Sequence, residues 1–173
     1  KLDNISLISN SDSHSLQKIG REANIFETEL SYRGIFEAIK SRDPKKFLAT
    51  IEFFPEEGKY HYDGHRDCEI VFSPEETKKH NAICPKCGKK LTVGVMNRVD
   101  ELADRTADYR DEKRVPYHSL IPLDEIIAES FGVGTQAKKV AEEYKNLIKN
   151  LGNELDILLE ISEEKIKSVA DPR

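Results

Sequence analysis

The sequence has no long apolar run and no pattern of a secretory signal peptide. Because a membrane-spanning helix needs about 20 mostly apolar residues, we expect a soluble, cytoplasmic protein without membrane contacts. An excess of positive charge is also missing, since 27 Lys and Arg face 32 Asp and Glu, for a formal net charge of −5. Any contact with nucleic acid must therefore come from a local patch. No Gly-x4-Gly-Lys-Ser/Thr loop is present, so we expect no bound nucleotide.

Cysteine is scarce, and its three copies all lie in one region. Cys68 follows His65 by three positions, and Cys84 and Cys87 repeat that spacing after an interval of fifteen residues. Each pair can aim two ligands at one ion from a single tight turn, and two such turns close a tetrahedral zinc site. Four protein ligands leave no open position for water or substrate, so we predict a structural Zn²⁺.

The fourth ligand of this site has alternatives. His65 has the expected spacing, but His61, His80 and Asp63 lie in the same region. Two other interpretations need no metal, namely three buried free cysteines or a disulfide within the second cysteine pair. A disulfide would leave one cysteine unpaired, so a reducing environment with bound zinc fits the sequence better.

Hydrophobic periodicity predicts a mixed α and β chain. We expect strands at 5–9, 24–28, 47–54, 68–72 and 91–95, and helices capped by Ser31 and Ser73, at 95–104, and in the last fifty residues. In that last part, apolar stripes predict two packed helices that are separated by residues 132–135, and Ser162 begins a third helix. Residues 106–122 show no periodicity and are crowded with charge.

Asp12 and His14 follow the first apolar run. In an extended chain, side chains two positions apart point the same way, so a carboxylate and an imidazole can share one metal. Two ligands do not make a hydrolytic centre, which needs three or more protein ligands and a bound water. The alternative is a turn in which Asp12 and Ser15 bond to the backbone while His14 is exposed.

The Gly-x-Gly link between the two predicted C-terminal helices also has two interpretations. Gly132, Gly134 and Thr135 can present backbone amides to a DNA phosphate, flanked by Lys138 and Lys139. The plainer interpretation is a glycine cap that reverses the chain between two packed helices.

Several stretches together resemble one family. Residues 9–15, Ser-Asn-Ser-Asp-Ser-His-Ser, look like the last metal motif of PHP-type phosphoesterases. Five further stretches resemble endonuclease Q and its archaeal and bacterial relatives, namely residues 19–24, 50–52, 58–61, 63–66 and 97–105. Some of these relatives are labelled helicase-related. The resemblance spans about residues 5–165. It implies a PHP barrel that cleaves DNA beside deaminated bases with divalent metal ions, followed by a zinc-binding module and a helical region.

The sequence departs from this family in one respect. A PHP site begins with a His-x-His pair, and only the final Asp-x-His is present here. The resemblance implies that Asp12 and His14 are catalytic-metal ligands of a longer parent protein, and that His65 and the three cysteines hold structural zinc. We therefore expect a C-terminal fragment that lacks the N-terminal barrel and is inactive alone.

The predicted fold class is α+β, with four parts. Residues 1–44 are a remnant of the PHP barrel, a distorted TIM-like fold, and residues 45–105 form a small zinc-binding α/β module. Residues 106–122 form a charged loop, and residues 123–173 form a helical hairpin of the helix-hairpin-helix type.

The predicted parent is a metal-dependent DNA endonuclease of DNA repair, with DNA as its partner and divalent catalytic metals. One alternative is a non-catalytic zinc-ribbon module that binds nucleic acid or protein. A second alternative is a PHP-type phosphatase of small phosphoesters.

Overall fold

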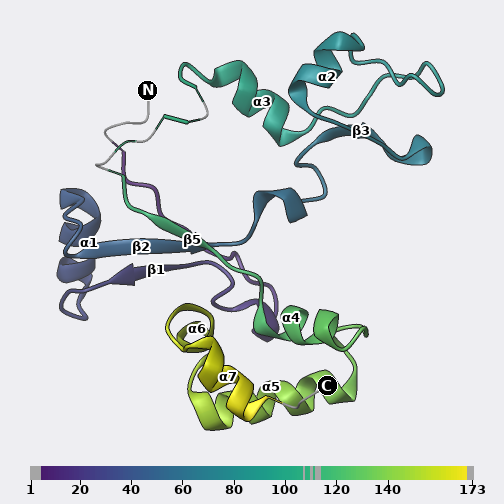
Figure 1. The fold of residues 1–173 in the computed structure, drawn as a ribbon. Helices are drawn as coiled ribbons and strands as arrows, with labels where there is room; N and C mark the ends of the chain where they lie inside the picture. The colour runs from purple at the N-terminus through teal and green to yellow at the C-terminus, as the bar shows by residue number, and fades with distance from the viewer. Residues whose placement is uncertain (1–4, 107, 110, 112–113, 171–173) are drawn as a thin grey trace. The chain divides into compact units, whose positions relative to one another are not determined.

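The structure, a computed structural model, describes residues 5–106, 108–109, 111 and 114–170. Within these residues the chain is mixed α and β, with seven α-helices and five short strands (Figure 1). It divides into two compact units, the first comprising residues 1–7, 28–46 and 54–115, and the second residues 8–27, 47–53 and 116–173. No helix of the described part is long and apolar enough to cross a membrane.

Helix α1 (Tyr32–Ser41) belongs to the first unit and begins where the sequence predicts. Ser31 Oγ accepts a hydrogen bond from the Gly34 N–H (3.0 Å), which satisfies one of the unpaired donors at the helix start. A Cβ at Gly34 would lie 2.5 Å from the Glu29 carbonyl oxygen, so this turn has no room for a side chain. The helix ends at Arg42, which takes a left-handed conformation with φ 53°.

The rest of the first unit is built on an antiparallel hairpin of β3 (Asp63–His65) and β4 (Ile70–Phe72). Helix α2 (Pro74–Lys79) follows β4 and begins with a capping box. Ser73 Oγ accepts from the Glu76 N–H (3.3 Å), and the Glu76 carboxylate accepts from the Ser73 N–H (2.8 Å). Single 3₁₀ turns lie on either side of β3, at 55–57 and 66–68.

Helix α3 (Val95–Leu102) is fixed to β3 by a buried carboxylate. Asp63 is 1% exposed and accepts hydrogen bonds from the Gly94 N–H (2.5 Å) and from Asn97 Nδ2 (2.7 Å). A Cβ at Gly94 would lie 2.4 Å from the Tyr62 carbonyl oxygen, so the close approach of helix and strand requires glycine. The local sequence thus places the start of α3 directly against the strand that leads into the metal region.

The second unit contains a three-stranded sheet in the order β1-β2-β5. The central strand β2 (Phe47–Glu52) pairs antiparallel with β1 (Ala23–Phe26) and parallel with β5 (Tyr117–Ser119). The Phe26 and Phe47 rings pack with centroids 4.6 Å apart. A short 3₁₀ helix, η1 (Leu16–Lys18), precedes β1.

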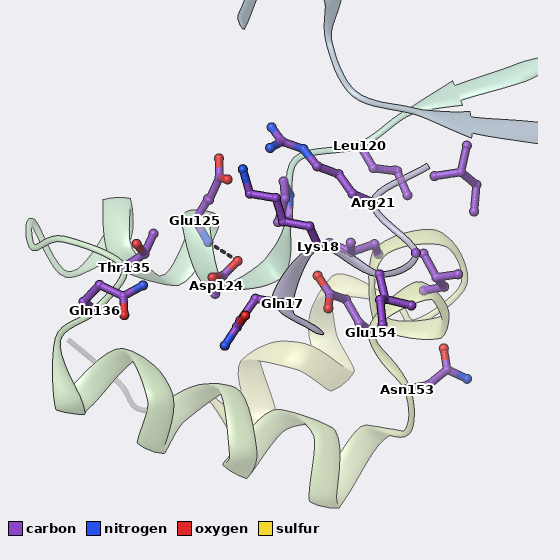
Figure 2. A pocket seen from close by; sticks show the side chains of 16 residues that line it. Gln17, Lys18, Arg21, Leu120, Asp124, Glu125, Thr135, Gln136, Asn153 and Glu154 are labelled. Atoms are coloured by element: carbon purple, nitrogen blue, oxygen red, sulfur yellow. Dashed lines mark hydrogen bonds between the residues drawn. The ribbon is translucent and has the colours of Figure 1, made fainter. Parts of the chain in front are cut away.

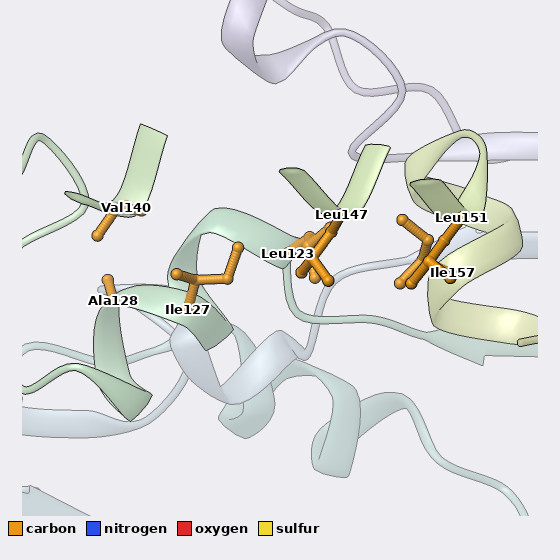
Figure 3. Packing of buried hydrophobic residues seen from close by; sticks show 7 residues of the cluster. All are labelled: Leu123, Ile127, Ala128, Val140, Leu147, Leu151 and Ile157. Carbon is orange, nitrogen blue, oxygen red and sulfur yellow. The ribbon is translucent and has the colours of Figure 1, made fainter. Parts of the chain in front are cut away.

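Four helices complete the second unit, namely α4 (Leu123–Ser130), α5 (Lys138–Leu151), α6 (Glu154–Leu159) and α7 (Glu163–Val169). Their inner faces form one apolar core, which Figure 3 shows: Leu123, Ile127, Ala128, Val140, Leu147, Leu151 and Ile157. Full burial of a Leu or Ile side chain contributes about 1.5–3 kcal/mol, so these contacts stabilise the packing of the helices. Gly152, with φ 111°, ends α5 as predicted.

Two predicted strands are wrong. Residues 5–9 form no strand, and Ile5, Leu7 and Ile8 are more than half exposed. The backbone of Ser9 bonds to a side chain and not to a neighbouring strand within the described residues. In the predicted strand at 91–95, only Thr92 forms a bridge, because α3 already begins at Val95.

Three elements were missed. Strand β3 lies at Asp63–His65, where we predicted zinc ligands but no strand. Strand β5 lies inside the segment that we interpreted as a charged loop, and α6 is a separate short helix after Gly152. The predicted β1, α1, β2, α2, α4, α5 and α7 are confirmed within a few residues at their ends.

Candidate functional site

The predicted zinc ligands come together in the first unit. One ligand atom from each of His65, Cys68, Cys84 and Cys87 lies within 4.8 Å of all the others. His65 ends β3, and Cys68 ends the 3₁₀ turn that follows it. The sequence therefore places two ligands at one edge of the hairpin and two in a second turn.

The second turn is shaped by its own backbone. The Gly88 N–H donates to the Cys84 carbonyl (2.8 Å), and the Cys84 N–H donates to the Lys89 carbonyl (2.8 Å). Gly88 has φ 74°, a conformation that glycine adopts without strain. Lys86 Nζ donates to the Cys68 carbonyl (2.8 Å), which ties the second ligand turn to the first.

The separation of two of the ligand atoms fits zinc. His65 Nδ1 lies 3.5 Å from Cys87 Sγ. A tetrahedral zinc with Zn–S of about 2.3 Å and Zn–N of about 2.0 Å separates these two atoms by about 3.5 Å. The donor set of three thiolates and one imidazole is also a common structural zinc set. The residues therefore fit a metal such as zinc, with Nδ1 as the ligating atom of His65.

The thiols differ in their electrostatics. Burial and the neighbouring thiols of Cys87 and Cys84 raise the pKa of Cys68 to about 11. Burial also acts to raise the pKa of Cys84, but donation from the Cys87 and Lys86 backbones more than offsets it, and the net pKa is lowered. N–H groups directed at a thiolate are a usual second layer around a metal ligand. A divalent cation would stabilise all three thiolates.

The alternative fourth ligands have other roles. The His61 ring meets the Tyr62 ring edge-on, with centroids 4.4 Å apart, and the His80 ring stacks on Phe72 at 4.9 Å. Asp63 is engaged by the start of α3, as described above. All three cysteines are free thiols, so no disulfide is present in this region.

Asp12 and His14 also lie close to each other, in the second unit. Asp12 Oδ2 is 3.8 Å from His14 Nε2, and both side chains are more than 90% exposed. Asp12 takes a left-handed conformation with φ 43°. Among the described residues, no third His, Cys, Asp or Glu joins them in a cluster of three. The pair can therefore contribute two ligands, and it needs others for a complete site.

The backbone of Ser9, three residues before Asp12, is held by the side chain of Asn24. Asn24 Oδ1 accepts from the Ser9 N–H (2.9 Å), and Asn24 Nδ2 donates to the Ser9 carbonyl (2.7 Å). The Asn24 side chain thus provides the two hydrogen bonds that the Ser9 backbone would make with a neighbouring strand. Nothing in the sequence indicates this contact, because a single Asn has no characteristic spacing.

The predicted DNA-contact turn joins α4 and α5. Gly132 has φ 62°, and the Val133 N–H closes the end of α4 on the Ala128 carbonyl (3.0 Å). Helix α5 begins with two lysines, and it has no side-chain cap and no acidic residue in its first turn. Its N-terminal amides therefore lack the usual local acceptors, a feature that suits an anion.

The two lysines of this turn differ. Lys139 Nζ donates to the Phe131 carbonyl (3.1 Å) and lies 5.1 Å from the centre of the Phe131 ring. Lys138 is 90% exposed and pairs only loosely with Glu142 (3.3 Å), one turn further on. Lys139 therefore helps to close the turn, and Lys138 is better placed for an external contact.

A cavity of about 400 Å³ lies in the second unit and was not predicted (Figure 2). Glu154, on its wall, accepts from the Leu123 N–H (2.8 Å) and from the Tyr144 hydroxyl (2.7 Å). Burial, then the bond to Glu154 and the charges of Glu154 and Asp124, raise the pKa of Tyr144 to about 12. These contacts join α4, α5 and α6, so Glu154 has a structural role in this wall.

Comparisons with known proteins identify similar chains. A family model described as the MJ0043 C-terminal domain matches residues 122–172. The uncharacterized protein MJ0043 of Methanocaldococcus jannaschii is 35% identical over 98% of this chain, which is 22% of its own length. The uncharacterized protein YqxK of Bacillus subtilis is 33% identical over 96% of this chain and 39% of its own. The chain thus spans well under half of the curated relatives that it matches.

Two solved structures are similar over 97% of this chain at 33% identity. One is the lesion-specific endonuclease PfuEndoQ from Pyrococcus furiosus, with a TM-score of 0.86 over 42% of that chain. The other is endonuclease Q in complex with a 27-mer duplex substrate that has an abasic lesion at the active site, with a TM-score of 0.80 over 43% of that chain. The mixed α and β fold described above is therefore similar to part of endonuclease Q.

Proposed function

We propose that this chain is the C-terminal part of a PHP-type, metal-dependent endonuclease that acts in DNA repair. The observation that carries the proposal is the match to the lesion-specific endonuclease PfuEndoQ, which covers 97% of this chain with a TM-score of 0.86. A similarity of this extent at 33% identity goes beyond one shared motif. The proposed reaction is hydrolysis of a phosphodiester beside a deaminated base, and the proposed partner is DNA.

The proposed roles divide between the two units. In the second unit, Asp12 and His14 hold a divalent catalytic ion together with ligands from the rest of the longer protein. Such an ion supplies an activated water and stabilises charge on the phosphate. Their separation of 3.8 Å and their exposure leave them accessible to that ion. With only these two ligands, residues 1–173 alone are expected to be inactive.

In the first unit, the His65, Cys68, Cys84 and Cys87 set is proposed to hold structural zinc. A four-ligand site has no position for substrate, so its function is to fix the hairpin and the two turns. The division into a barrel remnant (1–44), a zinc module (45–105), a charged loop (106–122) and a helical hairpin (123–173) belongs to the same proposal.

The turn between α4 and α5 is proposed to contact the DNA backbone through the amides of Gly134 and Thr135 and through Lys138. The predicted contact from the Gly132 amide is not kept, because its N–H already donates to the Glu129 carbonyl (3.0 Å). Lys139 supports this turn through its bond to Phe131. Replacing Lys138 with Gln should weaken duplex binding regardless of sequence and reduce the slope of log affinity against log salt by about 1. Lys145→Gln, at another exposed position of α5, is the matched control.

The function is tested with the longer protein that contains this chain. Duplexes with uracil, hypoxanthine or an abasic site should be nicked in the presence of a divalent metal, and undamaged duplex should not. Asp12→Asn and His14→Asn should abolish nicking, whereas the exposed Asp67→Asn should not. Absence of metal-dependent nicking by the longer protein would refute the proposal.

One alternative rests on a specific observation. The first unit has a complete four-ligand cluster, whereas the Asp12 and His14 pair is incomplete within the described residues. A non-catalytic zinc module that binds nucleic acid would have this combination. It predicts lesion-independent DNA binding and no cleavage by the longer protein. Turnover of a generic phosphomonoester without DNA cleavage would instead indicate a phosphatase.

A further inference from the structure

The first unit contains a cavity of about 540 Å³ whose lining combines aromatic and basic side chains. Tyr60 and Tyr62 line it, together with Lys59 and Arg66. His65, a residue of the candidate metal centre, also lines this cavity. The proposed zinc site does not use the tyrosines, and the proposed function assigns them no role.

The two tyrosine side chains are exposed. Tyr60 is 60% exposed and Tyr62 is 41% exposed. The Tyr62 ring contacts the His61 ring edge-on, and part of its surface stays open. Two partly exposed rings beside one cavity, two positions apart in the chain, offer aromatic area to a ligand with an aromatic or apolar face.

The backbone that carries these rings is hydrogen-bonded to the start of α3. The Tyr60 carbonyl accepts from the Val95 N–H (2.8 Å), and the His61 carbonyl accepts from the Met96 N–H (2.9 Å). The Asp63 carboxylate accepts from the N–H of Gly94, the residue before α3, as described above. Three successive contacts thus fix this segment to the start of α3. A site that is held in place before binding loses little conformational entropy when a ligand enters.

The charged residues around the cavity narrow the kind of ligand that it can bind. Lys59 Nζ lies 5.2 Å from the centre of the Tyr60 ring, and Arg66 provides a second cation. Glu56 and Glu57 also line the cavity, together with apolar Ile70 and Val71. Carboxylates repel phosphate, so a phosphate group is a poor occupant of the interior. This lining favours an uncharged planar ring inside the cavity, with an attached anionic chain beside the two cations.

We propose that Tyr60 and Tyr62 form a stacking site for an unpaired nucleobase of single-stranded DNA, with Lys59 and Arg66 contacting its backbone. Bases stack on exposed aromatic side chains, and basic residues track the phosphates, in many single-strand binding sites. The inference rests on the proposed function, because it names the part of a DNA substrate that the first unit contacts. It does not depend on Asp12, His14 or cleavage.

The test uses the whole chain, its zinc retained, and a short single-stranded oligothymidine that carries one 2-aminopurine. Binding is measured by anisotropy, and stacking is measured by quenching of the 2-aminopurine fluorescence. Tyr60→Leu and Tyr62→Leu should each weaken binding by roughly 5- to 150-fold and reduce quenching, since one base–aromatic stack is lost. Tyr60→Phe and Tyr62→Phe keep a ring and should stay close to the unchanged protein.

Tyr32→Leu is the matched control. Tyr32 is 84% exposed, stacks on Phe36 and does not line this cavity, so its replacement should leave binding unchanged. Zinc content and circular dichroism are measured for each variant. A variant that keeps both and binds more weakly has lost a contact with the oligonucleotide and not its fold. Unchanged affinity of a folded Tyr60→Leu/Tyr62→Leu variant would overturn the stacking site, as would no binding of the oligonucleotide by the unchanged chain. Nicking by the longer protein remains a separate test of the proposed function.

Discussion

His65 Nδ1 lies 3.5 Å from Cys87 Sγ, although 22 positions separate the two residues in the chain. The contact joins the end of β3 to the second cysteine turn. No hydrophobic cluster of this first unit matches the seven-residue core of the second unit among the residues described. A shared metal would therefore add to the two other links of this region, the Lys86 bond to the Cys68 carbonyl and the Gly64–Thr92 bridge.

Loss of a cysteine ligand should unfold the metal-bearing part of the first unit. Apparent zinc affinities of about 10–16 kcal/mol in small structural sites exceed the stability of most domains, so folding and metal binding are coupled there. Cys84→Ser and Cys87→Ser should each lower zinc content and thermal stability, measured by elemental analysis and calorimetry. Asp12→Asn should change neither property. Equal stability of Cys84→Ser and the unchanged chain would contradict the structural role.

The identity of the fourth ligand is tested by histidine replacements. Cobalt bound to three thiolates and one imidazole gives a characteristic absorption spectrum. His65→Ala should alter that spectrum and weaken binding, because the set loses its nitrogen ligand. His80→Phe keeps a ring on Phe72, and His61→Phe keeps a ring beside Tyr62, so both should retain the spectrum. A spectrum altered by either control and not by His65→Ala would reassign the ligand.

Asp63→Ala should destabilise the first unit by about 1–3 kcal/mol. The substitution leaves the buried Gly94 N–H and the Asn97 amide without their acceptor, and an unpaired buried donor costs about that much. The measurement is chemical denaturation monitored by circular dichroism. Asp67→Ala removes an exposed carboxylate four residues along the chain and should cost less than about 0.5 kcal/mol.

The stability of the second unit should fall at alkaline pH through Tyr144. The folded state raises the pKa of Tyr144 from its ordinary value of 10.0 to about 12, so the folded chain holds this proton more tightly than the unfolded chain. That contribution is complete below pH 10 and is lost as the pH rises towards 12. Tyr144→Phe has no such proton, so its melting temperature should decline less over this interval. Parallel declines would show that the phenol is not responsible.

Local patterns predicted the helix starts and the ligand set. Ser31 and Ser73 cap helices through hydrogen bonds to residues three positions away. Such a cap can be predicted from the local sequence, because both partners lie within one short segment. The metal-ligand set could be predicted for a similar reason. His65 and Cys68 form one closely spaced pair, Cys84 and Cys87 form another, and the site needs only that the two turns meet. Strand β5 was missed because Tyr117–Ser119 is short, and its parallel pairing with β2 depends on residues more than sixty positions away.

The errors have the same origin. Apolar residues 5–8 indicated a buried strand, but the Asn24 side chain takes the place of a paired strand at Ser9. Residues 91–95 are rich in apolar side chains, but the acceptor that Asp63 offers to Gly94 starts a helix at Val95. In both places a polar side chain from elsewhere in the sequence takes part in fixing the backbone conformation. The hydrophobic periodicity of a segment carries no information about such a contact.

The most direct test is zinc K-edge X-ray absorption of the chain purified without chelator, together with its zinc content. We predict one zinc per chain, coordinated by three sulfurs at about 2.3 Å and one imidazole nitrogen at about 2.0 Å. Protein that folds with no bound metal, or a metal surrounded by oxygen ligands only, would contradict the account.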